Sequence, residues 1–202
     1  MIPGWRTELL PEASLCGQGC EVVGICDRTV FMKLQLAASS DLPEIVQLIN
    51  LAFRGEVGWT LESKYIEGER INLKTLQENI DERPDALVMV WRDERVGTLL
   101  GSVWLEPKNN GVWYMGLLAV RPDRQGQQLG RRMLEASEEA IRHHGGRRIR
   151  ISVVNVRQKL TTWYERRGYV RTGEMEPFPY GDDRVGRPLR DDLEFVMLEK
   201  EI

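Results

Sequence analysis

Residues Leu117 to Leu134 read LLAVRPDRQGQQLGRRML and form the most informative stretch of the chain. The apolar run VWYMGLLAV, residues 112–120, ends inside it and is typical of a buried strand. Gly126 and Gly130 then mark a loop that leads directly into an amphipathic helix. The apolar face of that helix is formed by Leu129, Met133, Ala136, Ala140 and Ile141.

The start of this helix has the features of an anion site. Free N–H groups and the helix dipole attract negative charge there, and glycine lets a phosphate approach the backbone closely. Arg121, Arg124, Arg131 and Arg132 stand against the single acid Asp123, a local charge of +3 on a chain of net charge -3. The pattern favours a phosphorylated ligand, and a solvated basic turn is the alternative.

The composition is that of an ordinary globular protein. The chain has 202 residues, 42% of them hydrophobic, which predicts one domain with an appendage. Acidic residues outnumber basic ones 31 to 28, which argues against nucleic-acid binding. The longest apolar run has nine residues, whereas a membrane-spanning helix needs about 20. The opening MIPGWRTELLPEAS has no secretory pattern, so we expect a cytoplasmic protein and no membrane partner.

Residues 1–29 show no sustained period and form a predicted N-terminal extension to a domain at residues 30–202. Met32 is an alternative start. Cys16, Cys20 and Cys26 all lie in the extension. Their number is odd and their spacing fits no common zinc pattern, so we expect neither a disulfide framework nor a metal site.

The remaining pattern predicts a mixed α/β domain. We expect strands at residues 30–37, 86–92, 96–106, 112–120, 148–154, 169–175 and 193–202. We expect helices at residues 41–53, 73–81, 129–144 and 156–167, with Ser40 or Asp41 as the first N-cap. The segments 54–71 and 177–192 read as loops. A strand-loop-helix-strand unit within a meander implies local parallel pairing in a mostly antiparallel sheet.

The run AVRPDRQGQQLGRRML resembles the signature of the GNAT superfamily of N-acetyltransferases, Gln/Arg-x-x-Gly-x-Gly/Ala after a strand. In that family the signature binds the pyrophosphate of acetyl-coenzyme A. Gln125 takes its first position and Gly130 its last, but Gln128 stands where the family has a glycine. Backbone amides can still bind phosphate from a Gln, provided that its φ stays negative.

The second half agrees with this resemblance. ISVVNVRQKLTTWYERRGYVRTGE is similar to another family run, in which an Asn precedes aromatic-Tyr-x-x-x-Gly-aromatic. The matching residues are Asn155, Trp163, Tyr164, Gly168 and Tyr169. The resemblance covers residues 30–202. It implies a mostly antiparallel sheet of about seven strands flanked by about four helices, with splayed fourth and fifth strands at 112–120 and 148–154.

The resemblance implies an acyl-CoA-dependent N-acyltransferase. Such an enzyme moves an acetyl group from acetyl-CoA to a primary amine of a small molecule by direct attack in a ternary complex. The implied cofactor contacts are Leu118, Ala119, Val120, Gln125, Gly126, Gln127, Gln128, Leu129, Gly130, Arg131 and Asn155. Tyr164 takes the position of the general acid, and the alternative is a core tyrosine packed beside Trp163.

The base and the acceptor are less defined. Many relatives carry a Glu on or beside the fourth strand, but VWYMGLLAV contains no acid. Glu56, Glu62, Glu67 and Glu69 could act through a water relay, or they are solvated loop charges. Candidate acceptor contacts are Arg54, Trp59, Glu62, Trp113 and Tyr180. The acids could attract a cationic amine, whereas Arg54 and Arg70 could equally meet a carboxylate.

Two other functions stay open at this point. One is an acyltransferase that uses a longer acyl donor or acetylates a protein N-terminus. The other, of a different class, is a GNAT-like module that binds CoA without turnover and acts as a sensor or interaction domain. His143 and His144 end a helix and read as solvent-facing caps. Homodimers are common in the family, but no feature here sets the oligomeric state.

Overall fold

The computed structural model describes residues 33–59, 61–124 and 128–202. Within these ranges the chain forms a seven-stranded sheet in the order β1-β3-β4-β5-β6-β9-β7. Its strands are β1 (Gln35–Leu36), β3 (Leu87–Arg92), β4 (Leu99–Pro107), β5 (Val112–Val120), β6 (Arg148–Val154), β7 (Val170–Pro177) and β9 (Glu194–Glu201). The β5–β6 pair is parallel and the other pairs are antiparallel, which confirms the predicted mixed α/β class.

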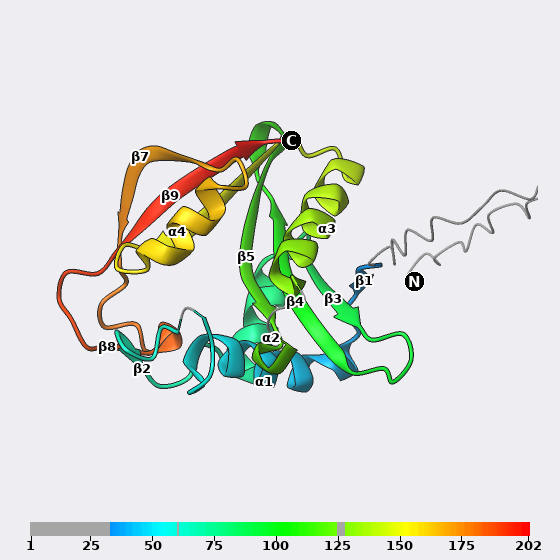
Figure 1. Cartoon of the computed structure of the whole chain (residues 1–202), viewed down its shortest axis with the longest axis horizontal. Helices are drawn as coiled ribbons and strands as arrows, with labels where there is room; N and C mark the ends of the chain where they lie inside the picture. The colour runs from blue at the N-terminus through cyan, green and yellow to red at the C-terminus, as the bar shows by residue number, and fades with distance from the viewer. Residues whose placement is uncertain (1–32, 60, 125–127) are drawn as a thin grey trace, which may run out of the picture. The chain divides into compact units, whose positions relative to one another are not determined.

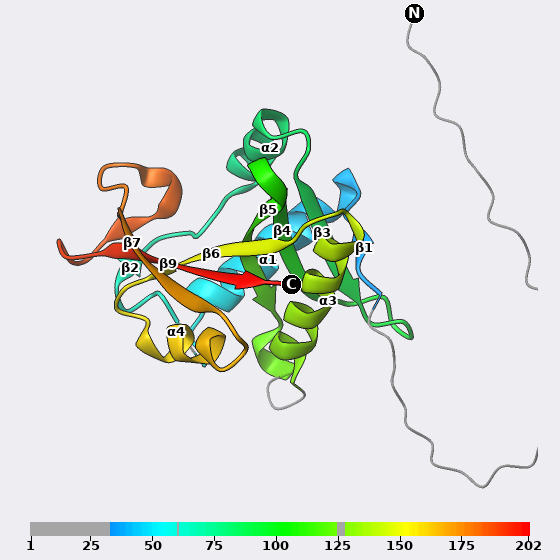
Figure 2. The same ribbon diagram turned by 90° about the horizontal axis from the view of Figure 1, so that it is seen from above.

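Four α-helices cover the two faces of this sheet in the described part of the chain. They are α1 (Leu42–Arg54), α2 (Leu73–Glu82), α3 (Leu129–His143) and α4 (Gln158–Glu165). Figure 2 shows α1 and α2 on one face and α3 and α4 on the other. Strand β3 serves both faces, because Val88 and Val90 pack under α1 and α2 while Met89 and Trp91 join the core under α3.

The helix ends follow local chemistry. Asp41 precedes α1 as expected, but its carboxylate accepts from Ala38 N and from Arg92 Nη2, both at 2.8 Å, and does not cap the helix. Asn72 does cap α2, since its Oδ1 accepts from Thr75 N at 2.8 Å. Helix α3 ends before Gly145, whose φ of 79° suits the residue after a helix.

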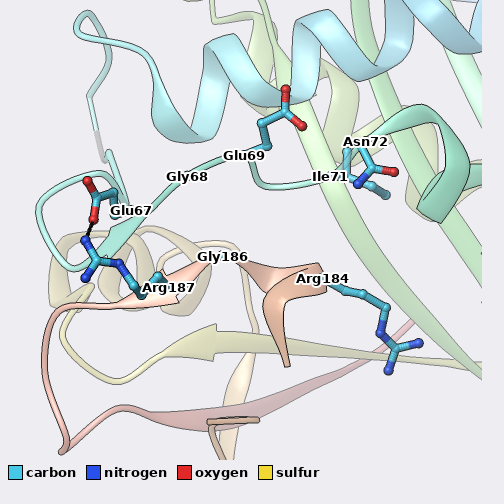
Figure 3. Close-up of a pocket in the computed structure, with 8 residues that line it drawn as sticks. All are labelled: Glu67, Gly68, Glu69, Ile71, Asn72, Arg184, Gly186 and Arg187. Atoms are coloured by element: carbon cyan, nitrogen blue, oxygen red, sulfur yellow. Dashed lines mark hydrogen bonds and ion pairs between the residues drawn. The ribbon is translucent and has the colours of Figure 1, made fainter. Parts of the chain in front are cut away.

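The structure differs from the predicted elements mainly at short or edge segments. Of the strand expected at 30–37, only β1 is formed among residues 33–37, and residues 30–32 lie outside the described ranges. The segments expected to be loops contain β2 (Ile66–Glu67) and β8 (Arg187–Pro188), which pair with each other (Figure 3). Strands of two residues carry no periodicity, so the sequence pattern could not show them. The predicted extension 1–29 also lies outside the described ranges.

The centre of the sheet splays open (Figure 1). Strands β5 and β6 pair only from Val112 and Arg148 to Tyr114 and Arg150. Beyond these pairs the strands separate, as expected for the fourth and fifth core strands. Strand β5 also carries a bulge, because the stretch from Ser102 to Trp104 faces one residue more on β5. Leu117, in this bulge, has a φ of 49°, a costly conformation for a branched side chain.

No helix in the described ranges has the length and apolar character that crossing a membrane requires. Two hydrophobic cores fill the space between the sheet and the helices on its two faces. A cavity opens where β5 and β6 separate.

Candidate active site

A cavity of about 700 Å³ occupies the gap between the splayed strands. It extends from the start of α3, at Gln128 and Gly130, past the inner edges of β5 and β6. Its other end is lined by Phe53 at the end of α1 and by the following loop, including Glu62 and Arg70. One cavity therefore connects a helix N-terminus with a cluster of charged side chains.

The N-terminus of α3 presents backbone donors that the helix itself does not use. The first helical bond runs from Arg132 N to Gln128 O at 3.0 Å, so the N–H groups of residues 129–131 have no partner within the helix. A Cβ added at Gly130 would lie 3.7 Å from Trp163 Cζ2, an ordinary contact that leaves no space for a larger side chain on that side. This end of the cavity suits an anionic group.

Gln128 does not meet the condition set by the sequence analysis. Its φ is 55° and its ψ is 23°, the left-handed conformation, so the condition of a negative φ is not met and the phosphate donors that remain here are the N–H groups of residues 129–131. The turn into α3 requires this conformation, which explains why a glycine is suited to the position. A Gln there costs roughly 1 kcal/mol. Gln125, Gly126 and Gln127 lie outside the described residues.

Of the four arginines predicted at the anion site, three line the cavity and one does not. Arg121, Arg124 and Arg131 line the cavity. Arg121 pairs with Asp123 at 2.9 Å and Arg131 with Glu135 at 2.8 Å. The guanidinium of Arg132 instead lies 4.9 Å from the Trp91 ring centroid.

Arg167 is a cavity residue that the sequence pattern missed. Its guanidinium stacks 3.7 Å from the Trp163 ring centroid and donates to Trp163 O at 2.7 Å. Burial lowers the pKa of this guanidinium, and the neighbouring Arg131 lowers it further. Arg167 thus adds positive charge beside Gly130 and the start of α3.

The inner edge of β5 is free of strand partners past Tyr114. Leu118 and Val120 line the cavity, whereas Ala119 points into the core under α1. An extended ligand can add to such an edge by backbone hydrogen bonds, as a further strand would. Leu118 to Val120 lie along the route between the two ends of the cavity, and their role as cofactor contacts stays a prediction.

Tyr164 lies in the middle of the cavity wall, on α4. Its ring packs edge to face against Trp163 and Tyr169, with centroids at 4.9 and 5.3 Å. Burial raises the pKa of Tyr164 to about 12, so the phenol keeps its proton at neutral pH. Among the described residues its hydroxyl has no hydrogen-bond partner. This phenol is therefore available to a ligand as a donor.

Hydrogen bonds among three polar side chains hold the Tyr169 ring, against which Tyr164 packs. The Tyr169 hydroxyl donates to Glu138 Oε1 at 3.2 Å, and Lys200 Nζ donates to Glu138 Oε2 at 2.7 Å. Burial and the nearby Glu138 carboxylate raise the pKa of Tyr169. This arrangement fixes the ring against which Tyr164 packs.

Glu62 is the central residue of a charged cluster at the end of the cavity opposite to the start of α3. It is 5% exposed, and its two oxygens accept from Arg54 Nη1 at 2.6 Å and Arg157 Nη1 at 2.5 Å. Arg70 Nε lies 4.0 Å from the same carboxylate. Arg54 also donates to Val185 O at 3.0 Å, and burial lowers the pKa of its guanidinium. Glu62, Arg70 and Arg157 line the cavity, while Arg54 supports Glu62 without lining it.

The other predicted acceptor and cofactor residues are dispersed. Trp59 lines the cavity, with its ring centroid 6.4 Å from that of Trp163. Trp113 is buried away from it, 5.8 Å from the His144 ring, and the Tyr180 hydroxyl accepts from Leu193 N at 2.7 Å. Asn155 donates to Asp192 O at 2.8 Å and does not line the cavity.

The four candidate glutamates separate clearly by burial. Glu56, Glu67 and Glu69 are exposed, which fits solvated loop charges, whereas Glu62 is buried among arginines. Strand β5 spans Val112–Val120, the run that contains no acid. Across residues 33–59, 61–124 and 128–202, no three His, Cys, Asp or Glu side chains gather as a metal site would require.

The sequence of the chain matches a known protein family. A family model described as "Acetyltransferase (GNAT) family" matches residues 44–169 of the chain. Among curated proteins, none matches the chain in sequence.

Solved structures share the fold at low sequence identity. A ribosomal-protein-alanine N-acetyltransferase from Brucella melitensis is 16% identical, with a TM-score of 0.60, over 85% of this chain and 100% of that one. A PaiA N-acetyltransferase from Thermoplasma acidophilum, solved with coenzyme A, is 15% identical, with a TM-score of 0.60, over 85% and 99%. An IAA acetyltransferase from Bacillus cereus is 13% identical, with a TM-score of 0.57, over 85% and 99%. These likenesses establish the fold.

Proposed function

The chain belongs to the acetyltransferase (GNAT) family, and from this premise we propose that it transfers the acetyl group of acetyl-CoA to a primary amine of a small molecule. The observation that carries the proposal is the single cavity that joins the α3 N-terminus, the free β5 edge, Tyr164 and the Glu62 cluster. Both substrates can therefore meet within one site, as direct transfer requires.

The residues present suit acetyl-CoA. The N–H groups of residues 129–131 and the side chains of Arg124 and Arg167 would hold its pyrophosphate. The backbone of Leu118 to Val120 would hold its pantetheine arm, and one N–H there would polarise the thioester carbonyl. When bound, the cosubstrate supplies the activated acyl group.

The transfer forms a C–N bond and breaks a C–S bond, so one proton must move from the amine nitrogen to the departing sulfur. We assign Tyr164 as the general acid that donates at the sulfur. Its raised pKa keeps the proton on the phenol until negative charge develops on the sulfur. The proton that the attacking nitrogen loses returns to the Tyr164 phenolate, so the transfer balances without a carboxylate on β5.

Ligand binding can be tested by thermal unfolding. Acetyl-CoA at 100 times its Kd should add about 2.7 kcal/mol to the free energy of unfolding. Gly130→Ala should keep this stabilisation, because its Cβ makes an ordinary contact with Trp163. Gly130→Glu should lose it, because it places a carboxylate where phosphate is expected. No stabilisation of the wild type, or equal stabilisation of both variants, would refute the site.

Turnover is tested by acetyl-CoA-dependent thiol release with a panel of primary amines. Tyr164→Phe should lower kcat by about 100-fold or more while it leaves acetyl-CoA binding intact. Binding without thiol release for every amine would instead identify a sensor module of the GNAT fold.

A further inference from the structure

We propose that the acceptor carries a carboxylate beside its amine, as an amino acid does, and that Arg70 and Arg157 bind this carboxylate. The inference rests on the proposed function, since it names the acceptor class of the same site. It stands on the charges, the unused donors and the free volume at the end of the cavity opposite to α3.

The charges at this end are unbalanced. One carboxylate, that of Glu62, is surrounded by the guanidinium groups of Arg54, Arg70 and Arg157. Both carboxylate oxygens already accept hydrogen bonds from arginines. Glu62 therefore has little left to offer an ammonium group, and the cluster as a whole is positive. An anion is the ligand that this environment favours.

Arg70 has donors to spare. Its guanidinium makes no hydrogen bond to the described residues, and its distance of 4.0 Å from Glu62 is beyond hydrogen-bond reach. It lines the cavity with 26% of its side chain exposed.

The position of Arg70 is nevertheless fixed. Its backbone N–H donates to Asn50 Oδ1 at 2.7 Å, and its guanidinium lies 5.7 Å from the Phe53 ring centroid. The guanidinium of Arg157 lies 5.5 Å from the same ring, so Phe53 orients both cations. A planar guanidinium held in this way matches a carboxylate with two parallel hydrogen bonds.

There is room for the rest of such an acceptor. A second cavity of about 290 Å³ shares Arg70, Tyr114, Gly116 and Leu117 with the first. Arg70 thus lies where the two cavities adjoin, beside the bulge of β5. A molecule whose carboxylate binds there can direct its amine along β5 and place its side chain in the second cavity.

The same charges account for the absence of a carboxylate base on β5. Nearby positive charge disfavours the ammonium form of an amine and so lowers its pKa. An acceptor held beside Arg70 and Arg157 is thereby biased toward the neutral amine that attacks. The proton is lost to solvent on binding, and no protein carboxylate is needed to remove it.

The test compares α-amino acids with the amines that remain when the carboxylate is removed, for example L-methionine with 3-(methylthio)propylamine and L-leucine with 3-methylbutylamine. Thiol release is measured for wild type, Arg70→Gln, Arg70→Lys and the control Arg95→Gln, which changes an exposed arginine on the β3–β4 turn. For the wild type we expect kcat/KM to be at least about tenfold higher for the amino acids.

Arg70→Gln should raise the KM for the amino acids by about tenfold or more, and Arg70→Lys should lie between it and the wild type. The KM for acetyl-CoA should stay unchanged in all variants. Turnover with a preference for the carboxylate-free amines would overturn the inference and leave the proposed function standing.

A second readout is independent of turnover. Calorimetry measures binding of N-acetyl-L-methionine and of N-acetyl-3-(methylthio)propylamine to the protein saturated with CoA. Tighter binding of the carboxylate, lost in Arg70→Gln, supports the inference even where thiol release fails. Equal binding of the two compounds contradicts it.

Discussion

Arg157 Nη1 donates a hydrogen bond to Glu62 Oε1 although the two residues lie 95 positions apart in sequence. Arg157 directly precedes α4, the helix that carries Tyr164, and Glu62 lies in the loop after α1. This contact therefore links the proposed acceptor end of the cavity to the helix of the proposed general acid. A change at Glu62 affects both.

We expect Glu62→Gln to destabilise the protein by about 3 kcal/mol, because it leaves buried guanidinium groups without their counter-charge. Glu67→Gln is the matched control, since Glu67 pairs with Arg187 on the surface and should contribute less than about 1 kcal/mol. Urea unfolding of the two variants measures both values. Equal losses would show that the Glu62 cluster is energetically no different from a surface pair.

Gln128→Gly should stabilise the protein by about 1 kcal/mol, because glycine adopts the left-handed conformation at the start of α3 without steric cost. Gln77→Gly, in the exposed middle of α2, should have the opposite effect of similar size. Thermal unfolding distinguishes the two signs. A destabilised Gln128→Gly would mean that the Gln side chain contributes more than its backbone strain costs.

The pKa of Tyr164 predicts a loss of stability at high pH. The phenol titrates at 10.0 when unfolded and at about 12 when folded, so between these values the unfolded chain binds fewer protons. The free energy of unfolding therefore falls as pH rises from 10 to 12, by at most about 3 kcal/mol from this group. Its contribution is fully present below pH 10.

The comparison of wild type with Tyr164→Phe isolates this effect from other titrating groups. The free energy of unfolding of the wild type, taken relative to that of Tyr164→Phe, should be constant below pH 10 and should fall above it. A difference that changes below pH 9 would show that the phenol ionises more easily than its burial implies.

Two glycines of the segment before β8, Gly181 and Gly186, allow the steric cost of an added side chain to be separated from the conformational cost. Gly186 and Gly181 have φ values of 87° and 86°, so Ala is strained at both. At Gly186 a Cβ would also lie 2.6 Å from Glu67 O, beside the β2–β8 pair (Figure 3), whereas at Gly181 it would meet nothing within 4 Å. Gly186→Ala should therefore cost about 1–3 kcal/mol more than Gly181→Ala in thermal unfolding. Equal costs would show that β8 moves aside freely.

The parts of the fold with long, regular patterns were predictable. The run at residues 112–120 is strand β5 over the same bounds, and the strand at 148–154 is β6. The position of the cavity end at the start of α3 was predictable for the same reason, because β5 and α3 follow each other closely in sequence. Here the contacts that define the site are close in sequence, so spacing alone carries the information.

The proposed acceptor end was predictable only in part: Trp59 and Glu62 were expected there and line the cavity, but the contacts between distant residues that assemble this end were not. Nothing around Arg157 indicates a partner at Glu62, and the β2–β8 pair joins segments that each lack periodicity. Trp113 illustrates the reverse case. It was expected near the acceptor from its aromatic character, yet it lies on the core face of β5, since strand alternation decides on which face a residue falls. The role of Tyr164 stays a prediction.

The splay between β5 and β6 also bears on the order in which this protein assembles on the ribosome. Strands β1, β3, β4 and β5 are all complete before β6 is synthesised, and the three residue pairs of β5 and β6 are the ladder that joins the two halves. The second half of the sheet, β6, β7 and β9, is complete only after β9 has been synthesised, because β9 lies between β6 and β7 but follows both in sequence. Because a chain is made from the N-terminus onward, β5 is complete before its partner β6 has been synthesised. The edge of β5 that lines the cavity is therefore made before the strand that faces it across the gap.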